Sequence, residues 1–314
     1  MKKVAFIFPG QGSQTVGMGK DLYENYPQIK ESFNIADKLL GNSLTSLMFD
    51  GPVEELTNTE NAQPALLLNS AVINKVLNEQ GIYPEVTAGH SLGEYSALVA
   101  SGAISLEDAL PLVQTRGRLM EKAFPKGQGT MAAVLGLPSD KIIEVINSLS
   151  DTDETVDIAN YNCPGQVVIS GTKKGIEIAS VQLKEAGAKR VILLNVSGPF
   201  HSKLMKPAAQ QLEEAFQTVE ISDAQIPIYA NVTAKKESDK NELTKLLIKQ
   251  LYSPVRFEEI IENMLQDELD AIVEIGNGKV LSGLVKKVNR RMKTFTLQDY
   301  ESVEMFIQWY KEES

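Results

Sequence analysis

The 314-residue chain contains little of what disulfide-bonded, metal-binding and membrane-spanning proteins depend on. Cys163 is the single cysteine, which excludes an intramolecular disulfide and is typical of the reducing cytoplasm. One cysteine and two histidines supply too few ligands for a structural zinc site, so no metal is expected. The apolar run at residues 4–8 is too short for a signal peptide, and no run approaches the length of a transmembrane helix. We therefore expect a cytoplasmic protein that does not enter a membrane.

Basic residues are fewer than acidic ones, and the formal net charge is −10. A nucleic-acid partner is not expected, and any acidic partner must bind a local basic patch. The glycine-rich loop at residues 9–14 lacks the third glycine of a dinucleotide fingerprint, since Thr15 stands at that position, and no phosphate-binding P-loop motif occurs. Nucleotide binding is therefore disfavoured. A hydrophobic content of 43% nevertheless predicts a well-packed core.

The most informative motif is Gly-His-Ser-Leu-Gly at residues 89–93. It follows an expected strand at 85–89 and precedes an expected helix at 92–101, and this is the context of a nucleophile elbow. In such an elbow the serine oxygen is exposed at the start of the helix, and the flanking glycines allow strand and helix to pass closely. Ser91 is therefore a candidate nucleophile; the alternative is a serine that only caps the helix.

A serine nucleophile needs a base near neutral pH, and imidazole is the usual one. His90 is adjacent to Ser91 on the elbow, where neighbouring side chains diverge, so it is poorly placed. His201, which follows the Gly198-Pro199 turn, is the remaining histidine. By elimination we expect His201 to be the base.

The order of expected elements indicates an α/β protein with a smaller region inserted in it. Strands are expected at 4–8, 85–89, 226–230, 271–275 and 293–297, and helices at 20–40, 63–80, 92–101, 105–123, 203–217, 241–251 and 279–291. Between them, segments 131–135, 139–149, 155–159, 166–170, 174–186 and 189–194 have the order strand, helix, strand, strand, helix, strand. This βαββαβ order is typical of a ferredoxin-like subdomain. The predicted domains are a core of residues 1–128 and 196–314 and a subdomain of residues 129–195.

An arginine interrupts the apolar face of the helix expected at 105–123. The apolar residues at three- and four-residue steps are Ala109, Leu112, Val113, Leu119, Met120 and Ala123. Arg116 falls within this face, whereas Arg118 lies on a polar face. A buried guanidinium needs an anionic partner. Helix periodicity alone favours a structural pair with an internal carboxylate over a clamp for a substrate carboxylate, and it leaves both open.

A series of motifs follows along the chain. They are PGQGSQ at 9–14, QPAL at 63–66, GHSLGEY at 89–95, RG at 116–117, NCPGQVVISG at 162–171, GPFHS at 198–202, QLYSPVR at 250–256 and GKVL at 278–281. Over residues 3–297 their order resembles that of malonyl-CoA:acyl carrier protein transacylases, in the form of the discrete bacterial enzyme of type II fatty acid synthesis. One departure is Asn277, where relatives usually carry proline. The resemblance implies an α/β-hydrolase-like core with a parallel sheet and an inserted ferredoxin-like subdomain.

The resemblance also implies roles for individual residues. Ser91 corresponds to the nucleophile, His201 to its base, and Gln250 to the residue whose main-chain carbonyl orients the imidazole. The backbone N–H groups of Gln11 and Leu92 correspond to the oxyanion hole. Four further positions correspond to residues around the substrate, with Arg116 gripping the malonyl carboxylate; they are Arg116, Gln63, Asn160 and Asn162.

The implied reaction transfers a malonyl group from malonyl-CoA to the phosphopantetheine thiol of acyl carrier protein, and it needs no cofactor beyond the thioester substrate. Three alternatives stay open: a serine esterase or thioesterase, an acyltransferase of polyketide synthesis, and a non-catalytic protein that binds a carrier. Inward-facing Arg116 and the absence of an HGGG-type loop argue against the first.

The helix expected at 279–291 has an apolar face and, on another side, a group of cations. The cations are Lys286, Lys287, Arg290 and Arg291. They form either a solvated helix end that favours the helix dipole or a docking patch for the acidic carrier protein that the resemblance implies. The sequence leaves these two interpretations even.

Overall fold

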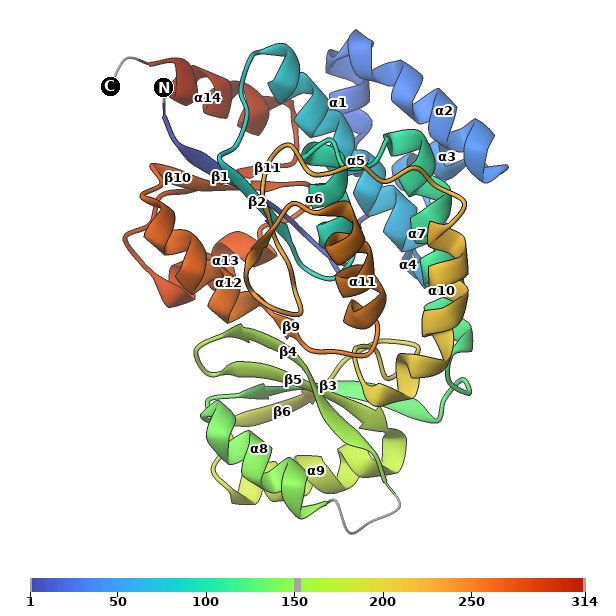
Figure 1. The fold of residues 1–314 in the computed structure, drawn as a ribbon, viewed down its shortest axis with the longest axis vertical. Helices are drawn as coiled ribbons and strands as arrows, with labels where there is room; N and C mark the ends of the chain where they lie inside the picture. The colour runs from blue at the N-terminus through green and yellow to red at the C-terminus, as the bar shows by residue number, and fades with distance from the viewer. Residues whose placement is uncertain (1, 150–153, 313–314) are drawn as a thin grey trace.

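The computed structural model describes residues 2–149 and 154–312 and has a mixed α/β fold (Figure 1). Residues 1, 150–153 and 313–314, which the predicted domain ranges include, lie outside the described residues. The larger sheet has the strand order β11-β10-β1-β2-β7-β8, with parallel neighbours except for the antiparallel pair β7–β8. Its strands are β1 (Val4–Phe8), β2 (Val86–Gly89), β7 (Ile228–Tyr229), β8 (Lys236–Glu237), β10 (Ala271–Ile275) and β11 (Thr294–Leu297).

Strand β1 occupies the middle of this sheet because every one of its side chains is apolar. Val4, Phe6 and Phe8 point into one core cluster, and Ala5 and Ile7 point into a second cluster on the other face. Successive strand residues face opposite sides, so a continuous apolar run requires cover on both faces. Helices supply that cover, and each large apolar side chain buried there contributes about 1.5–3 kcal/mol.

The helices of the larger region lie on both faces of the sheet (Figure 1). They are α1 (Lys20–Asn25), α2 (Lys30–Leu40), α3 (Leu44–Asp50), α4 (Val53–Thr57), α5 (Thr59–Glu79), α6 (Gly93–Ala100), α7 (Leu106–Lys122), α10 (Ala209–Phe216), α11 (Lys240–Gln250), α12 (Phe257–Met264), α13 (Val280–Val288) and α14 (Tyr300–Lys311). Helix α5 is buried along most of its length and packs against α7. In the described residues, no helix combines the length and apolarity needed to cross a bilayer.

Two segments that were predicted as continuous α-helices are interrupted, and each interruption contains a proline. The segment 20–40 is split by a 3₁₀ turn at Pro27–Ile29, because a proline disfavours helical geometry at the residue before it. Tyr26 is accordingly extended. The segment 203–217 begins as the 3₁₀ helix η2 (Lys203–Ala208), which contains Pro207, and becomes α-helical only at Ala209. A proline cannot donate the N–H that a continuous α-helix would require.

The predicted helix 279–291 is wrong at its end, because α13 stops at Val288. Asn289 is extended, and the chain turns back so that Thr294 can pair with Ile272 of the parallel neighbour β10. The helix predicted at 63–80 begins earlier, at Thr59. The end of α13 is thus set by the pairing of β11 with a distant strand.

The smaller sheet has the strand order β6-β3-β5-β4-β9. Its elements are β3 (Gly129–Leu135), α8 (Ser139–Ser148), β4 (Val156–Cys163), β5 (Gln166–Thr172), α9 (Lys173–Glu185), β6 (Arg190–Leu193) and β9 (Val255–Arg256). The strands between residues 129 and 193 pair antiparallel, and α8 and α9 cover the face turned away from the larger region (Figure 1). The predicted order of six elements is confirmed.

One strand joins the two regions. Strand β9 belongs to a much later part of the chain but pairs parallel with β4, matching Asn160 with Val255 and Tyr161 with Arg256. Because β9 directly follows α11 and precedes α12, it fixes the smaller sheet against these helices. The catalytic candidates of β4 and α11 are thereby brought to one junction.

Candidate active site

Ser91 lies at a strained turn between β2 and α6. Its φ is +53°, in the left-handed region that non-glycine residues rarely adopt and that costs about 1–3 kcal/mol. The turn is tight enough to require glycine on both sides: a Cβ on Gly89 would lie 1.9 Å from the carbonyl carbon of Gly93, and one on Gly93 would lie 2.0 Å from the oxygen of Phe8. The Ser91 N–H donates to Asn231 Oδ1 at 2.8 Å, which holds the turn in place. The geometry is that of a nucleophile elbow.

His201 lies within hydrogen-bond distance of this serine. Its Nε2 is 2.8 Å from Ser91 Oγ, and its Nδ1 is 2.8 Å from the main-chain oxygen of Gln250. A carbonyl oxygen can only accept, so Nδ1 carries the proton and Nε2 is free to accept the one on Ser91. His90 instead points its Nε2 at Asn162 Oδ1, 2.9 Å away. The two histidines of the chain therefore face different partners.

Burial keeps the His201 imidazole neutral. Desolvation is the largest cause, and the positive charge of Arg116 adds to it; together they lower the pKa of His201 to about 3. A neutral imidazole can accept the serine proton at any physiological pH. Burial likewise lowers the pKa of His90.

Arg116 reaches the serine from α7. Gly117 allows α7 to lie against the first turn of α5, since a Cβ there would be 2.7 Å from the Thr59 oxygen. The guanidinium is 1% exposed; Nη2 donates to Ser91 Oγ at 3.1 Å and to Gln250 Oε1 at 2.8 Å, and Nη1 donates to Gln63 Oε1 at 2.8 Å.

These contacts bear on the two interpretations of Arg116. In the described part of the chain no carboxylate oxygen lies within 4.0 Å of its guanidinium nitrogens, and its Nε is buried without a hydrogen-bond acceptor. Its hydrogen-bond acceptors are neutral amides and a hydroxyl, and the guanidinium lies over the Tyr95 ring, 5.2 Å from the ring centroid. A direct structural ion pair is therefore absent among these residues, and a cationic donor stands beside the nucleophile.

A cavity of about 350 Å³ opens onto Ser91. Among the predicted site residues, those that line it are Gln11, Ser91, Leu92, Arg116, Asn160, Asn162 and His201. No described residue accepts a hydrogen bond from the N–H of Leu92 or Gln11, so both amides are available as donors. Gln63 and Gln250 do not line the cavity; each accepts a hydrogen bond from the Arg116 guanidinium. The structure thus places seven of the predicted site residues around one cavity, and the other two in contact with Arg116.

Two residues that the sequence did not single out complete the site. Asn231, which follows β7, accepts from the Ser91 N–H and donates to the Gly89 oxygen at 2.6 Å. Glu94 on α6 is 1% exposed and accepts from Gln250 Nε2 at 2.6 Å and from the Asn231 N–H at 3.3 Å. The sequence does contain a signal for Glu94, since it is the only charged residue between positions 91 and 106. Asn231 had none, because only the fold brings it near Ser91.

The cations near α13 are placed differently from the prediction. Lys286 and Lys287 are exposed on the last turn, but Arg290 and Arg291 lie beyond the helix end, so the prediction that all four cations share one helix is wrong. Lys286 Nζ donates to the main-chain oxygen of Met292 at 2.5 Å, which ties the helix end to the following turn. Residues Val280, Leu281 and Leu284 of the same helix line the cavity. Lys286 and Lys287 are therefore on an element that borders the cavity, but neither of them lines it.

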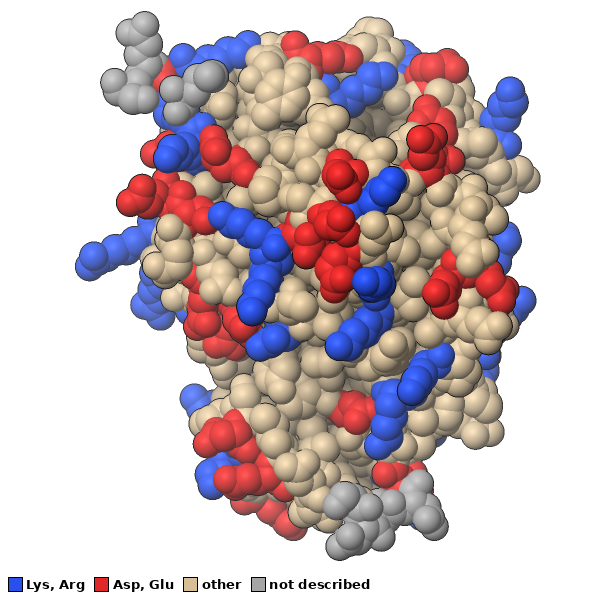
Figure 2. Space-filling view, viewed as in Figure 1, with Lys and Arg blue, Asp and Glu red and all other residues tan. Residues whose placement is uncertain are grey.

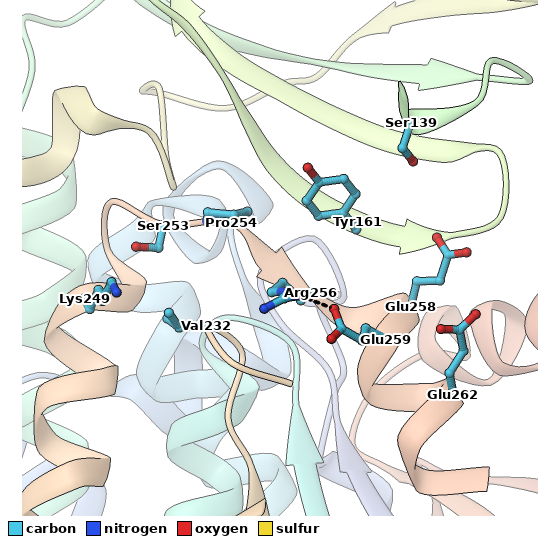
Figure 3. Close-up of a pocket in the computed structure, with 10 residues that line it drawn as sticks. All are labelled: Ser139, Tyr161, Val232, Lys249, Ser253, Pro254, Arg256, Glu258, Glu259 and Glu262. Carbon is cyan, nitrogen blue, oxygen red and sulfur yellow. Dashed lines mark ion pairs between the residues drawn. The ribbon is translucent and has the colours of Figure 1, made fainter. Parts of the chain in front are cut away.

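A second hollow, of about 670 Å³, lies where β9 and α12 meet the smaller region (Figure 3). Its charged lining consists of Lys249, Arg256, Glu258, Glu259 and Glu262, and Arg256 is paired with Glu259. It contains neither Ser91 nor His201. The larger hollow is therefore not the one that holds the nucleophile and the base.

An elbow serine, a neutral imidazole oriented by a carbonyl, and a cation beside the serine oxygen together define a serine acyl-transfer site. The family model described as an acyl transferase domain matches residues 5–310. The chain belongs to this family.

Its relatives include the malonyl CoA-acyl carrier protein transacylase of Bacillus subtilis, 54% identical over 314 residues, which are 100% of this chain and 99% of the relative. The protein of that name from Staphylococcus aureus is 47% identical over 303 residues, 96% of this chain and 98% of the relative.

Solved structures agree with these relatives. An acyl carrier protein S-malonyltransferase from Vibrio cholerae has a TM-score of 0.94 and 44% identity, covering 97% of this chain and 99% of that one. A malonyl-transacylase solved in complex with a type II polyketide acyl carrier protein has a TM-score of 0.94 and 40% identity, covering 98% of this chain and 99% of that one.

Proposed function

We propose that this protein transfers a malonyl group from malonyl-CoA to the phosphopantetheine thiol of acyl carrier protein, through a malonyl ester of Ser91, and so supplies fatty acid chain elongation. One observation carries the proposal: Ser91 Oγ lies 2.8 Å from a neutral imidazole and 3.1 Å from a buried guanidinium. The first activates the oxygen for attack on an acyl group, and the second favours an acyl group that bears a carboxylate.

The first half-reaction forms the serine ester. His201 Nε2 takes the Ser91 proton as the oxygen attacks the thioester carbonyl, and the backbone N–H groups of Leu92 and Gln11 stabilise the resulting oxyanion. Removal of one such donor commonly lowers a rate by about 10²–10³. The C–S bond then breaks, and His201 returns its proton to the departing coenzyme A thiol.

The second half-reaction runs in the opposite sense. His201 takes the proton of the carrier thiol as the sulfur attacks the ester carbonyl, and Ser91 recovers that proton as its C–O bond breaks. Coenzyme A and the carrier share the phosphopantetheine thiol, so one cavity suffices for both. Asn160 and Asn162 on β4 line this cavity, and we expect them to contact that arm. Nucleophile, base and electrophilic donors all come from the protein, so we expect no resident cofactor.

Arg116 gives the site its selectivity. A malonyl carboxylate can accept from the guanidinium in two parallel bonds, whereas an acetyl group leaves the buried cation with neutral partners. The same feature speaks against a general thioesterase, which needs no cation beside its serine. Transfer to a polyketide carrier is a second candidate, because a relative of 40% identity is complexed with such a carrier.

We also infer the finer architecture and location. The strand order β6-β3-β5-β4 with α8 and α9 on one face supports a ferredoxin-like subdomain of residues 129–195, set in an α/β-hydrolase-like core of residues 1–128 and 196–314. The elbow at the end of β2 supports the assignment of the core. Cys163, the single cysteine, supports a cytoplasmic location.

Intact mass after mixing with malonyl-CoA tests the proposal. We expect a single malonyl adduct that disappears when acyl carrier protein is added, and no adduct with Ser91→Ala. Ser96→Ala is the matched control, because Ser96 is a buried serine of the following helix α6 whose hydroxyl has no hydrogen-bond partner among the described residues. An adduct that persists in Ser91→Ala, or malonate released by water as fast as malonyl is transferred, would contradict the proposal.

A further inference from the structure

Gln250 connects the guanidinium of the site to a carboxylate that the reaction scheme leaves unused. Its Oε1 accepts from Arg116 Nη2 at 2.8 Å, and its Nε2 donates to Glu94 Oε2 at 2.6 Å. The side-chain amide is therefore inserted between cation and anion with its dipole aligned to both. The main-chain oxygen of the same residue orients His201. Gln250 thus links the charged pair Arg116 and Glu94 through its side chain and orients the base His201 through its main chain.

An anionic Glu94 fixes the direction of this amide. A carboxylate only accepts hydrogen bonds, so the NH₂ end of Gln250 must face Glu94 and the oxygen end must face Arg116. Asn231 holds the carboxylate from the other side through its N–H. Before substrate arrives, Glu94 is the one anion that balances Arg116 within the described residues around the serine.

The malonyl carboxylate changes this balance. On the proposed function it docks on Arg116, and the site then holds two carboxylates for one guanidinium in a dry environment. A second carboxylate near the first raises the pKa of one of the two, so we expect one of them to take up a proton. The malonyl group contacts the cation directly, whereas Glu94 reaches it only through an amide.

We propose that Glu94 is the buried counter-charge of Arg116 and that it takes up one proton when the malonyl carboxylate replaces it. The inference rests on the proposed function. The proton comes from solvent and is added to a Glu94 oxygen, and no other bond is formed or broken in that step. Glu94 is thus a positioning residue: by losing its negative charge, it allows Arg116 to bind an acyl group that carries a carboxylate.

The groups around Glu94 permit this exchange near neutral pH. Burial raises its pKa to about 7, against the opposing effect of hydrogen bonds from Gln250 and Asn231 and of the Arg116 charge. Tyr95, the other titratable group that faces it, has a pKa raised by burial and stays neutral. His201 is neutral as well. Glu94 is therefore the group of this network that titrates between pH 6 and 8.

Proton uptake during a single turnover of acylation tests the inference on the unmodified protein. In weakly buffered solution with an indicator at pH 7.5, malonyl-CoA should cause uptake of roughly three quarters of a proton per serine acylated, because a carboxyl with a pKa of about 7 is mostly ionised beforehand. The methyl ester of malonyl-CoA, which has the same acyl chain without the charge, should cause almost none. Equal uptake with both thioesters would overturn the inference.

The pH dependence of acylation separates Glu94 from other buried carboxylates. Between pH 6 and pH 8 the ratio of kcat/KM for malonyl-CoA to that for its methyl ester should fall about five- to tenfold, since an ionised Glu94 opposes the incoming charge. In Glu94→Gln the ratio should change less than twofold. Glu274→Gln is the matched control: Glu274 is a fully buried carboxylate, but it accepts from the N–H groups of Leu281 and Ser282 at the start of α13. It should keep the unmodified dependence.

The outcomes distinguish the two levels of the proposal. Absence of a malonyl adduct in the unmodified protein would contradict the proposed function itself. A malonyl adduct without differential proton uptake, or a pH dependence that survives Glu94→Gln, would contradict the role of Glu94 alone. If Glu94→Gln does not fold, the proton-uptake measurement still decides.

Discussion

Arg116 and the cations at the end of α13 show how differently burial treats the same kind of charge. Arg116 is held by three fixed hydrogen bonds, while Lys287 and Arg290 extend into solvent. An interaction of about 1 kcal/mol in water is several-fold stronger in a dry site. We therefore expect changes in the buried region to be large and insensitive to salt, and changes in the exposed region to be small and screened.

The distribution of charges on the surface is consistent with small effects in the exposed region. On the face drawn in Figure 2, basic and acidic side chains are interspersed and do not form one field of a single sign. With a net charge of −10, attraction of an acidic carrier cannot come from the molecule as a whole. Any electrostatic attraction must depend on a local group of cations.

The largest expected effect within this comparison comes from the base. His201→Ala should slow both half-reactions by about 10²–10⁴, because no other described imidazole contacts Ser91 Oγ. Rapid-quench measurement of CoA release and of transfer to the carrier gives the two rates. His90→Asn is the control, since His90 contacts Asn162 and not the serine, and it should lose less than about tenfold. Transfer by His201→Ala within a few fold of normal would remove His201 from the mechanism.

Arg116→Ala should have the second largest effect, and it should change the preference for malonyl over acetyl groups more than the rate of the chemical step. Loss of one partner of a buried charge pair costs roughly 2–5 kcal/mol, so malonyl transfer should fall by about 30-fold or more relative to acetyl transfer. The ratio of kcat/KM for the two thioesters measures this.

Arg118→Ala is the matched control for that ratio. Arg118 lies on the same helix but is exposed and paired with Glu60 at 2.9 Å, a surface ion pair that contributes little. Its removal should leave the ratio unchanged. Equal losses of malonyl and acetyl transfer in Arg116→Ala would show that Arg116 only supports the fold.

The sequence predicted what depends on local spacing. The elbow around Ser91 follows from strand, glycines and helix, and the inward position of Arg116 follows from helix periodicity. The sequence could not decide whether Arg116 had a structural carboxylate partner, because Glu94 reaches it only through Gln250, more than 130 residues away from Arg116 along the chain. Asn231 and the end of α13 were missed for the same reason: tertiary pairing, not local pattern, determines them.

The smallest expected effect belongs to the exposed cations. Reversal of Lys286, Lys287 and Arg290 to Glu should raise the KM for acyl carrier protein several-fold at low salt and weaken its salt dependence. Acylation by malonyl-CoA should change much less, because that half-reaction does not need the carrier.

Two structural facts make this a sharp test of the exposed region. Helix α13 borders the cavity through Leu284, and Lys286 and Lys287 are on the last turn of the same helix. Lys286 is also partly engaged in tying the helix end to Met292, so its contribution includes a structural part. The same reversal of three exposed lysines on α9, Lys173, Lys174 and Lys184, controls for net charge, because α9 covers the far side of the smaller sheet. If both sets raise the carrier KM equally, or if neither does, the α13 cations are a solvated helix end and the carrier docks elsewhere.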